Sequence, residues 1–442
     1  MTGAARLPVA AQSRAVSAGA PAWLFPLLLA LPFLIGIAVL KGLTVEIDTF
    51  HGSDARVYQL PTILQLSERL DFSGYPSAQT PLYHLLTAGW GKLVGFELWK
   101  LRLLNVAFSY GAALALLRLL RRATPLEPWQ AFALTLVFTL SPYFFGASFT
   151  LLTDNLAILF ALLAMERVNR FRSDASLVTF GTACLWIAGA VLTRQSFVWL
   201  APFAGWFLVR SPAPAGHRLA GAALLALALA PLAALVIEWR GLVPPTADPA
   251  SCGLCTDRPG VGRDSLTLRT VAFTVALLGA YAAFIFGPRL VRGDRRLFSV
   301  PGGAVALALG AGILLLAISP LVYEPILPGQ AGDAGFLWKI SDWLPVVFGS
   351  SLVFWLLVPL GCLAALVLVR RAGLESLPAV YLAAFLLAAL PVRLVYQKYF
   401  DPFALLALAL LARPPDLRTR WDYAGVVVLY VAFVAYAISF AG

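Results

Sequence analysis

The chain has 442 residues, of which 60% are hydrophobic and only 12% are charged, and its mean hydropathy is +0.83. A soluble domain is about half apolar and about a quarter charged, so this composition excludes an ordinary soluble protein and predicts a polytopic membrane protein. The net charge of +11 does not indicate nucleic-acid binding here, because membrane proteins concentrate Lys and Arg in their cytoplasmic loops.

The N-terminal region consists of a polar tail followed by a long apolar run. We expect residues 1–22 to form a cytoplasmic tail. The run from Trp23 to Leu40 is long enough to span a bilayer and is followed by no convincing cleavage site, so it predicts an uncleaved signal anchor. Residues 23–442 are then expected to form a single all-helical transmembrane domain.

Thirteen apolar segments are candidate membrane spans. They lie near residues 23–41, 99–120, 129–149, 152–169, 176–192, 196–210, 219–238, 267–288, 301–323, 344–369, 376–392, 399–412 and 423–440. The segment 84–96 is short and amphipathic, so we expect it to lie on the membrane surface rather than across it.

The distribution of arginine supports one topology. With the N-terminus in the cytoplasm, 19 of the 33 basic residues face the cytoplasm, and the short loops on that side are rich in Arg. One apolar stretch, 183–209, carries Arg194 near its centre. Two short spans that meet at Arg194 keep the neighbouring arginine clusters on one side, so we predict a break there.

The opposite, outer side collects three long loops: 42–98, 239–266 and 324–343. The first is the largest, and it is expected to carry the catalytic base on short surface helices. The loop 239–266 contains Cys252 and Cys255, a lone C-x-x-C pair that predicts half of a zinc site, a small disulfide or no site at all. No metal is assigned.

Acidic residues of the outer side are candidates for the catalytic base. Asp54 and Tyr58 are four residues apart, so they share a face if the segment is helical. Asp48 precedes them near the membrane surface, and both carboxylates could instead be solvated loop residues. Asp154 opens the helix predicted after the third span, where it either orients an acceptor or, with Thr153, simply caps the helix.

Cationic residues on the same side are candidates for binding a phosphate. Arg194 and Gln195 lie between two apolar runs, and an ionisable residue at such depth is usually functional, although an arginine can also extend to the interface. The planar fork of arginine suits phosphate oxygens. Lys339, beside Trp338, and the later pair Arg393 and Lys398 could complete a phosphate site, with Tyr83 close by in the first loop.

Several short motifs resemble the GT-C glycosyltransferases, most closely the dolichyl-phosphoglucose-dependent α-1,2-glucosyltransferase family. The motifs are Gly52-x-Asp54-x-x-x-Tyr58, Thr80-Pro81-Leu82-Tyr83, Thr153-Asp154, Arg194-Gln195-Ser196-Phe197-Val198-Trp199, Glu324-Pro325-Ile326-Leu327 and Phe336-Leu337-Trp338-Lys339. The resemblance runs from about residue 40 to 400. Tyr58 and Glu324 stand where the family has His, and a later Ala-Asp-Asn-Arg-His motif is missing.

The resemblance implies an inverting transfer of a hexose, glucose in the family it resembles, from a polyprenyl- or dolichyl-phosphate sugar to a lipid-linked or extracytoplasmic glycan or protein acceptor. Asp54, Asp48 and Asp154 are the candidate catalytic residues. Arg194, Gln195, Tyr58, Tyr83, Trp338, Lys339, Arg393 and Lys398 are the candidates for donor binding. No cofactor, nucleic acid or obligate protein partner is expected.

The composition suggests a bacterial inner membrane with the active face outside the cytoplasm; a eukaryotic chain would lie in the ER membrane. The main alternative is a transporter or a flippase of lipid-linked glycans, although the sequence has no inverted repeat. Another is an O-antigen-ligase-like transferase, which would have its largest outer loop late in the chain.

Overall fold

The computed structural model describes residues 21, 23–44, 54–72, 74–244, 267–292, 300–324, 333–392 and 395–439. Asp48, Cys252, Cys255 and Arg393, which were singled out in the sequence, lie outside this part of the chain, as do the motif residues Gly52 and Pro325-Ile326-Leu327 and residues 1–20 and 22 of the predicted tail. The predictions made for them are therefore not addressed by the structure.

Each of the thirteen segments predicted to be spans contains a helix. The helices are α1 (Leu24–Ala38), α5 (Leu98–Ala123), α6 (Pro128–Leu140) with α7 (Pro142–Ser148), α8 (Asp154–Asp174), α9 (Leu177–Thr193), α10 (Leu200–Val209), α11 (Ala215–Trp239), α12 (Arg269–Val291), α13 (Gly302–Ile318), α15 (Leu352–Ala372), α16 (Leu377–Ala389), α17 (Asp401–Leu411) and α18 (Ala424–Ser439).

Within the described residues, four helices are long and apolar enough to cross a membrane: α5, α11, α12 and α15. Several shorter apolar helices accompany them. The prediction of a helical, polytopic membrane protein is therefore confirmed.

Two predicted spans are not continuous helices. The segment 129–149 bends by 70° between α6 and α7, where Pro142 follows Ser141 and cannot continue the hydrogen-bond ladder of the helix. The segment 344–369 begins with a small hairpin of β1 (Val346–Val347) and β2 (Ser350–Ser351), and its helix starts only at Leu352. Gly349, with φ of +76°, permits that turn.

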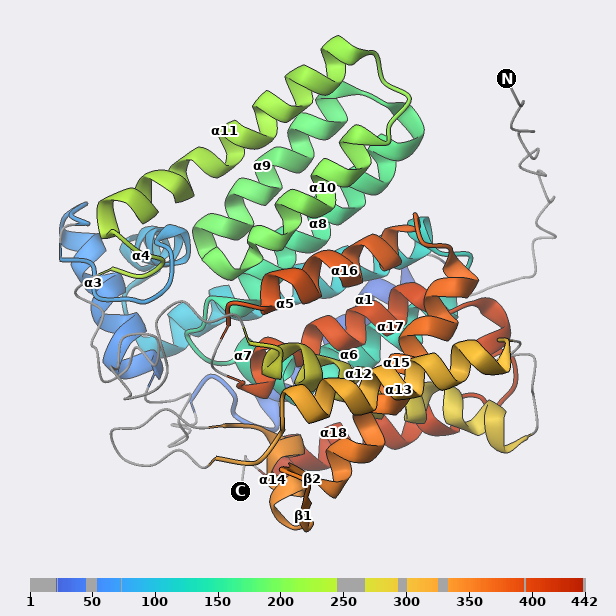
Figure 1. The fold of residues 1–442 in the computed structure, drawn as a ribbon. Coiled ribbons are helices and arrows are strands. Elements are labelled where there is room, and N and C mark those ends of the chain that lie inside the picture. Colours follow the sequence, from blue (N-terminus) through green and yellow to red (C-terminus); the bar gives the residue numbers. More distant parts are fainter. Residues whose placement is uncertain are drawn as a thin grey trace.

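The helices form two packed groups (Figure 1). The helices α8, α9, α10 and α11 lie side by side, with α9 packed against both α8 and α11. The second group contains α12, α13 and α15 to α18, and α5 packs against α8 between the groups. The α12–α15 crossing is close because Gly279 and Gly361 present no side chain, and a Cβ atom at either would collide with the facing backbone.

At one end of the bundle, three short helical elements cover the end of α11 (Figure 1). They are the π-helical turn η1 (Ala55–Gln59), α3 (Leu60–Glu68) and α4 (Leu82–Val94). The amphipathic segment 84–96 was predicted here, and α4 matches it to within two residues at each end. We call this the α3–α4 end.

A buried histidine ties these short elements together. The Tyr75 hydroxyl lies 2.6 Å from His84 Nδ1, and His84 Nε2 lies 2.6 Å from Gln59 Oε1. Burial lowers the pKa of His84 to about 3, so the ring is neutral. Because the amide oxygen of Gln59 can only accept, Nε2 carries the proton and Tyr75 donates to Nδ1.

The opposite end of the bundle is basic but internally paired. Glu166 of α8 contacts Arg118 and Arg122 of α5, and the buried Asp416 contacts Arg289 and Arg371. The arginine cluster in the last turns of α8 lies near the end of α10, since the Arg172 guanidinium lies 4.9 Å from the ring centre of Phe207. The predicted break at Arg194, which brings both to one side, is therefore confirmed.

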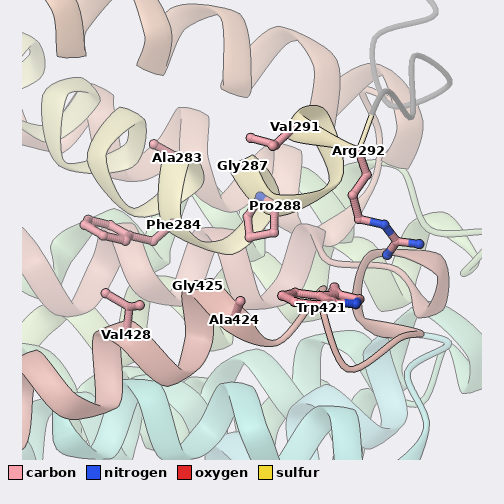
Figure 2. Close-up of a pocket in the computed structure, with 10 residues that line it drawn as sticks. All are labelled: Ala283, Phe284, Gly287, Pro288, Val291, Arg292, Trp421, Ala424, Gly425 and Val428. Atoms are coloured by element: carbon pink, nitrogen blue, oxygen red, sulfur yellow. The ribbon is translucent and has the colours of Figure 1, made fainter.

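An apolar pocket of about 640 Å³ opens between α12 and α18. Figure 2 shows that Phe284, Val428 and Trp421 line it, with Arg292 at one edge. Arg292 also pairs with Asp422 at the basic end. None of the residues that line this pocket is among the candidate site residues named from the sequence.

Candidate active site

Asp54 stands at the start of η1, directly before the helical elements of the α3–α4 end. Its side chain is about three-quarters buried, with 24% of its surface exposed, and Lys398 Nζ lies 3.5 Å from its Oδ2. Lys398 comes from η4 (Gln397–Tyr399), a 3₁₀ turn between α16 and α17. The first outer loop and the late basic cluster, far apart in sequence, therefore meet in one ion pair.

Arg194 occupies the break between α9 and the 3₁₀ turn η2 (Gln195–Trp199), which leads into α10. Its backbone is extended, with φ −150° and ψ 119°, so the helix stops and the side chain turns inward. The guanidinium lies 2.6 Å from Asp154 Oδ1 and 3.4 Å from the hydroxyl of Thr153. The motif residues of two separate spans thus form a second ion pair.

The ring of Tyr399 connects the two ion pairs. The Arg194 guanidinium carbon lies 4.9 Å from the ring centre, and Lys398 Nζ lies 5.2 Å from it. Both cations are therefore within attractive distance of the same ring, and the charge of Arg194 acts on Lys398. Two carboxylates and two cations, balanced in charge, form a cluster that we call the four-charge cluster: Asp54, Asp154, Arg194 and Lys398.

The electrostatics of the cluster suit proton transfer. Burial raises the pKa of Asp54 above its ordinary value, the neighbouring Lys398 offsets part of that rise, and the charge of Asp154 adds to it. Burial acts against the charge of Lys398, but Tyr399 and the two carboxylates outweigh it and raise the pKa of the lysine. A carboxylate made more basic by its surroundings, beside a cation that stays charged, matches the requirements of a general base.

Asp154 is held by buried amides that sequence reasoning missed. Asn105 of α5 donates to the carbonyls of Thr150 and Leu152, and Asn155 donates to Ser109 and to the carbonyl of Phe144. These bonds fix the turn that precedes α8. A buried Asn in an apolar helix is the signal that would have marked it.

The capping interpretation of this turn is not observed. Thr153 occupies the cap position of α8, but its side chain makes no capping hydrogen bond. The carboxylate of Asp154 instead faces Arg194.

Two sequence motifs are tied directly to each other. The Thr80 hydroxyl donates to the carbonyl of Val191 near the end of α9, at 2.8 Å. The Gln195 amide donates to the carbonyls of Ala78 and Leu242, at 2.7 and 3.1 Å. Gln195, predicted to bind the donor, therefore holds the loop before α4 against the Arg194 break.

Other predicted donor-binding residues lie in different surroundings. Tyr83 is fully buried in the small hydrophobic core of the α3–α4 end, and Tyr58 is half-buried one turn beyond Asp54. Trp338 is buried against Phe273, with ring centres 4.7 Å apart. Lys339 is exposed on α14 (Phe336–Asp342). Besides Asp54, the four-charge cluster contains three residues predicted from the sequence: Asp154 for catalysis, and Arg194 and Lys398 for donor binding.

The part of the chain that the structure describes contains no group of three His, Cys, Asp or Glu residues arranged to hold a metal. The four-charge cluster itself offers a candidate base and two cations. Such a set can remove a proton from a bound hydroxyl and stabilise negative charge that develops on an oxygen nearby.

Comparisons with known proteins add little to these observations. No family model matches the chain, and no curated protein matches it. Among solved structures, the chain is similar to the crystal structure of ArnT from Cupriavidus metallidurans in the apo state, with 13% identity over 93% of this chain and 77% of that one. The TM-score is 0.41, too low to support an argument, so the interpretation of the site rests on the residues of this chain.

Proposed function

We propose that this protein is an inverting glycosyltransferase of the GT-C class. It transfers a hexose, for which the motif resemblance suggests glucose, from a polyprenyl-phosphate sugar to a hydroxyl of an extracytoplasmic acceptor. The observation that carries the proposal is the four-charge cluster, in which the Asp54 carboxylate lies 3.5 Å from Lys398 Nζ and both cations contact one tyrosine ring.

In the proposed reaction, the acceptor hydroxyl oxygen attacks the anomeric carbon of the donor. The new bond forms between that oxygen and the anomeric carbon, and the bond from the carbon to the phosphate oxygen breaks. Asp54 takes the hydroxyl proton, and the polyprenyl phosphate leaves with the bonding electrons. Because this is one displacement, the configuration at the anomeric carbon inverts, and a β-linked donor gives an α-linked product.

The charges of the cluster fit this step. The reaction moves one negative charge from Asp54, which becomes protonated, to the departing phosphate. Lys398 and Arg194 both lie at the ring of Tyr399. Two cations are therefore already in place when the departing phosphate gains its second negative charge. Preorganised charge of this kind is usually the largest single contribution to catalysis.

Asp154 is proposed to orient Arg194 and not to remove the proton. Its Oδ1 lies 2.6 Å from the guanidinium, and one carboxylate contact leaves further N–H groups of the arginine fork for phosphate oxygens. Asp54 is the better candidate for the base because 24% of its side-chain surface is exposed, against 16% for Asp154.

The test measures donor binding and sugar transfer separately, with a short-chain polyprenyl-phosphate sugar and the full chain in detergent. Asp54→Asn is expected to bind donor but to lose transfer by about 10²- to 10⁴-fold. Arg194→Lys is expected mainly to weaken donor binding, since it keeps the charge and loses the fork. Glu97→Gln is the control, because Glu97 is an exposed carboxylate at the end of the first outer loop.

If Asp54→Asn turns over normally while Asp154→Asn is inactive, the base has been assigned to the wrong carboxylate. If both variants are active, the glycosyltransferase proposal is wrong, and flux of lipid-linked substrates in liposomes should then be measured for a transporter.

A further inference from the structure

A fully buried carboxylate, Asp401, lies close to the four-charge cluster without belonging to it. It is the first residue of α17 and has no exposed surface. Its oxygens accept hydrogen bonds from Ser141 at 2.6 Å, from Gln397 at 3.0 Å and from the hydroxyl of Tyr281. These donors are neutral and come from the α6–α7 bend, from η4 and from α12.

Gln397 links Asp401 to η4, the turn that carries Lys398. Its side-chain Nε2 donates to Asp401, and its Oε1 accepts from the backbone N–H of Leu337 at 2.8 Å. Its backbone N–H donates to the carbonyl of Ala334 at 2.8 Å. Every polar group of this side chain is thus used to fix the turn. The chain two residues before the turn is held as well, since the Trp338 indole donates to the carbonyl of Val395 at 2.7 Å.

The next two residues after Gln397 are the ones that touch the cluster. Lys398 pairs with Asp54, and the Tyr399 ring lies under both Lys398 and Arg194. In a turn of three residues, the backbone that Gln397 fixes also sets where these two side chains begin.

We infer that Asp401 is a positioning residue, which acts through Gln397 to hold Lys398 against Asp54 and Tyr399 beneath Arg194. The inference rests on the proposed function for its catalytic consequence, but the structural link can be measured without any substrate.

The energetics favour a positioning role over a purely stabilising one. A buried carboxylate is costly unless its charge is compensated, and here the compensation comes from three neutral donors and from the N-terminal end of α17. Well-packed apolar side chains of the same size often stabilise a protein at least as well as buried charge does. What an apolar residue at this position cannot do is fix Gln397 in one orientation.

A matched control exists near the other end of the same helix. Asp416 is also fully buried, but it is paired with Arg289 and Arg371 at the basic end. Asp416→Asn therefore perturbs a buried carboxylate of similar depth without touching η4. Any effect that Asp401 variants share with Asp416→Asn reports general stability.

The experiment compares Asp401→Ala, Asp401→Asn and Asp416→Asn in the full chain. Amide hydrogen exchange is measured on peptides covering 395–400, and the pH profile of kcat/KM is measured with the polyprenyl-phosphate sugar. Gln397→Met, which breaks the same link from the other side, replaces Asp401→Ala if that variant does not fold.

We expect Asp401→Ala to speed exchange over 395–400 by about tenfold or more and to lower kcat/KM on the order of 10²-fold, because small misplacements of reacting groups are costly. The acid limb of the profile, where kcat/KM falls at low pH because Asp54 becomes protonated, should move to higher pH. The groups that face Asp54 are Lys398, Arg194 and Asp154, and a displaced Lys398 no longer lowers the pKa of Asp54.

Asp401→Asn should restore most of both properties. Its amide oxygen can still accept from Tyr281 and Gln397, and the Ser141 hydroxyl can turn to accept from its amide group. Asp416→Asn should change thermal stability and leave exchange over 395–400 and the acid limb as in the wild type.

Unchanged exchange over 395–400 in Asp401→Ala would overturn the inference, and so would an effect no larger than that of Asp416→Asn. If the wild type transfers no sugar, the proposed function fails, and hydrogen exchange alone then decides whether Asp401 holds the turn.

Discussion

Breaking the ion pair of Arg194 with Asp154 is expected to cause a large and measurable loss of stability. The two side chains are only 10% and 16% exposed, and the charged atoms are 2.6 Å apart. Asp154→Asn keeps the shape of the side chain but leaves a buried arginine without its partner. Breaking a buried pair in this way costs about 3–5 kcal/mol, because the remaining charge is not compensated.

The control is the pair of Arg210 with Glu375, whose side chains are 55% and 63% exposed. Such exposed pairs contribute about 0.2–1 kcal/mol. Thermal unfolding in detergent should therefore show a much larger loss for Asp154→Asn than for Glu375→Gln. Replacing both partners, as in Arg194→Met with Asp154→Leu, should recover most of the loss, since no buried charge remains. If Asp154→Asn is no less stable than Glu375→Gln, the buried pair does not stabilise the break between α9 and α10.

Three further predictions concern the α3–α4 end and its neighbours. Lys398→Gln should move the acid limb of kcat/KM to higher pH, because the lysine lowers the pKa of Asp54, whereas Lys92→Gln on the exposed face of α4 should not. His84→Phe removes the buried hydrogen bonds of His84 with Tyr75 and Gln59 and should cost about 1–3 kcal/mol in thermal unfolding. Burial raises the pKa of Asp333 from 3.8 to about 6, so the stability of the wild type relative to Asp333→Asn should fall by about 3 kcal/mol as pH rises through that interval; a constant difference would contradict this.

The positions of the helices could be predicted because apolar length and charge are local properties of the chain. Each predicted span contains a helix, and the break at Arg194 followed from the requirement that the arginine clusters share one side. The bend at Ser141 and the hairpin before Leu352 were missed. The two segments concerned, 129–149 and 344–369, are apolar enough to be predicted as membrane spans. Only the local backbone geometry at Pro142 and Gly349 interrupts their helices.

The members of the cluster could be named from the sequence, but their pairing could not. Arg194 stood out as a charge between two apolar runs, and Asp54, Asp154 and Lys398 stood out as charges on the predicted outer side. That Lys398 pairs with Asp54 across more than 300 residues, and Arg194 with Asp154, depends on how the helices pack.

Aromatic residues at motif positions present a related difficulty for sequence analysis. Trp338 and Tyr83 match motif positions, yet both are buried in apolar cores, and periodicity does not distinguish a core aromatic residue from one that lines a site. Gln195 is tied to two backbone carbonyls, an arrangement that no local pattern signals.

The central claim, that the four-charge cluster binds the phosphate of a lipid-linked sugar, is tested most directly by an experimental structure with a polyprenyl-phosphate sugar analogue bound. The account predicts the phosphate within hydrogen-bond distance of Arg194 and Lys398, with the anomeric carbon facing Asp54. A phosphate bound instead at the apolar pocket between α12 and α18, beside Arg292, would contradict it.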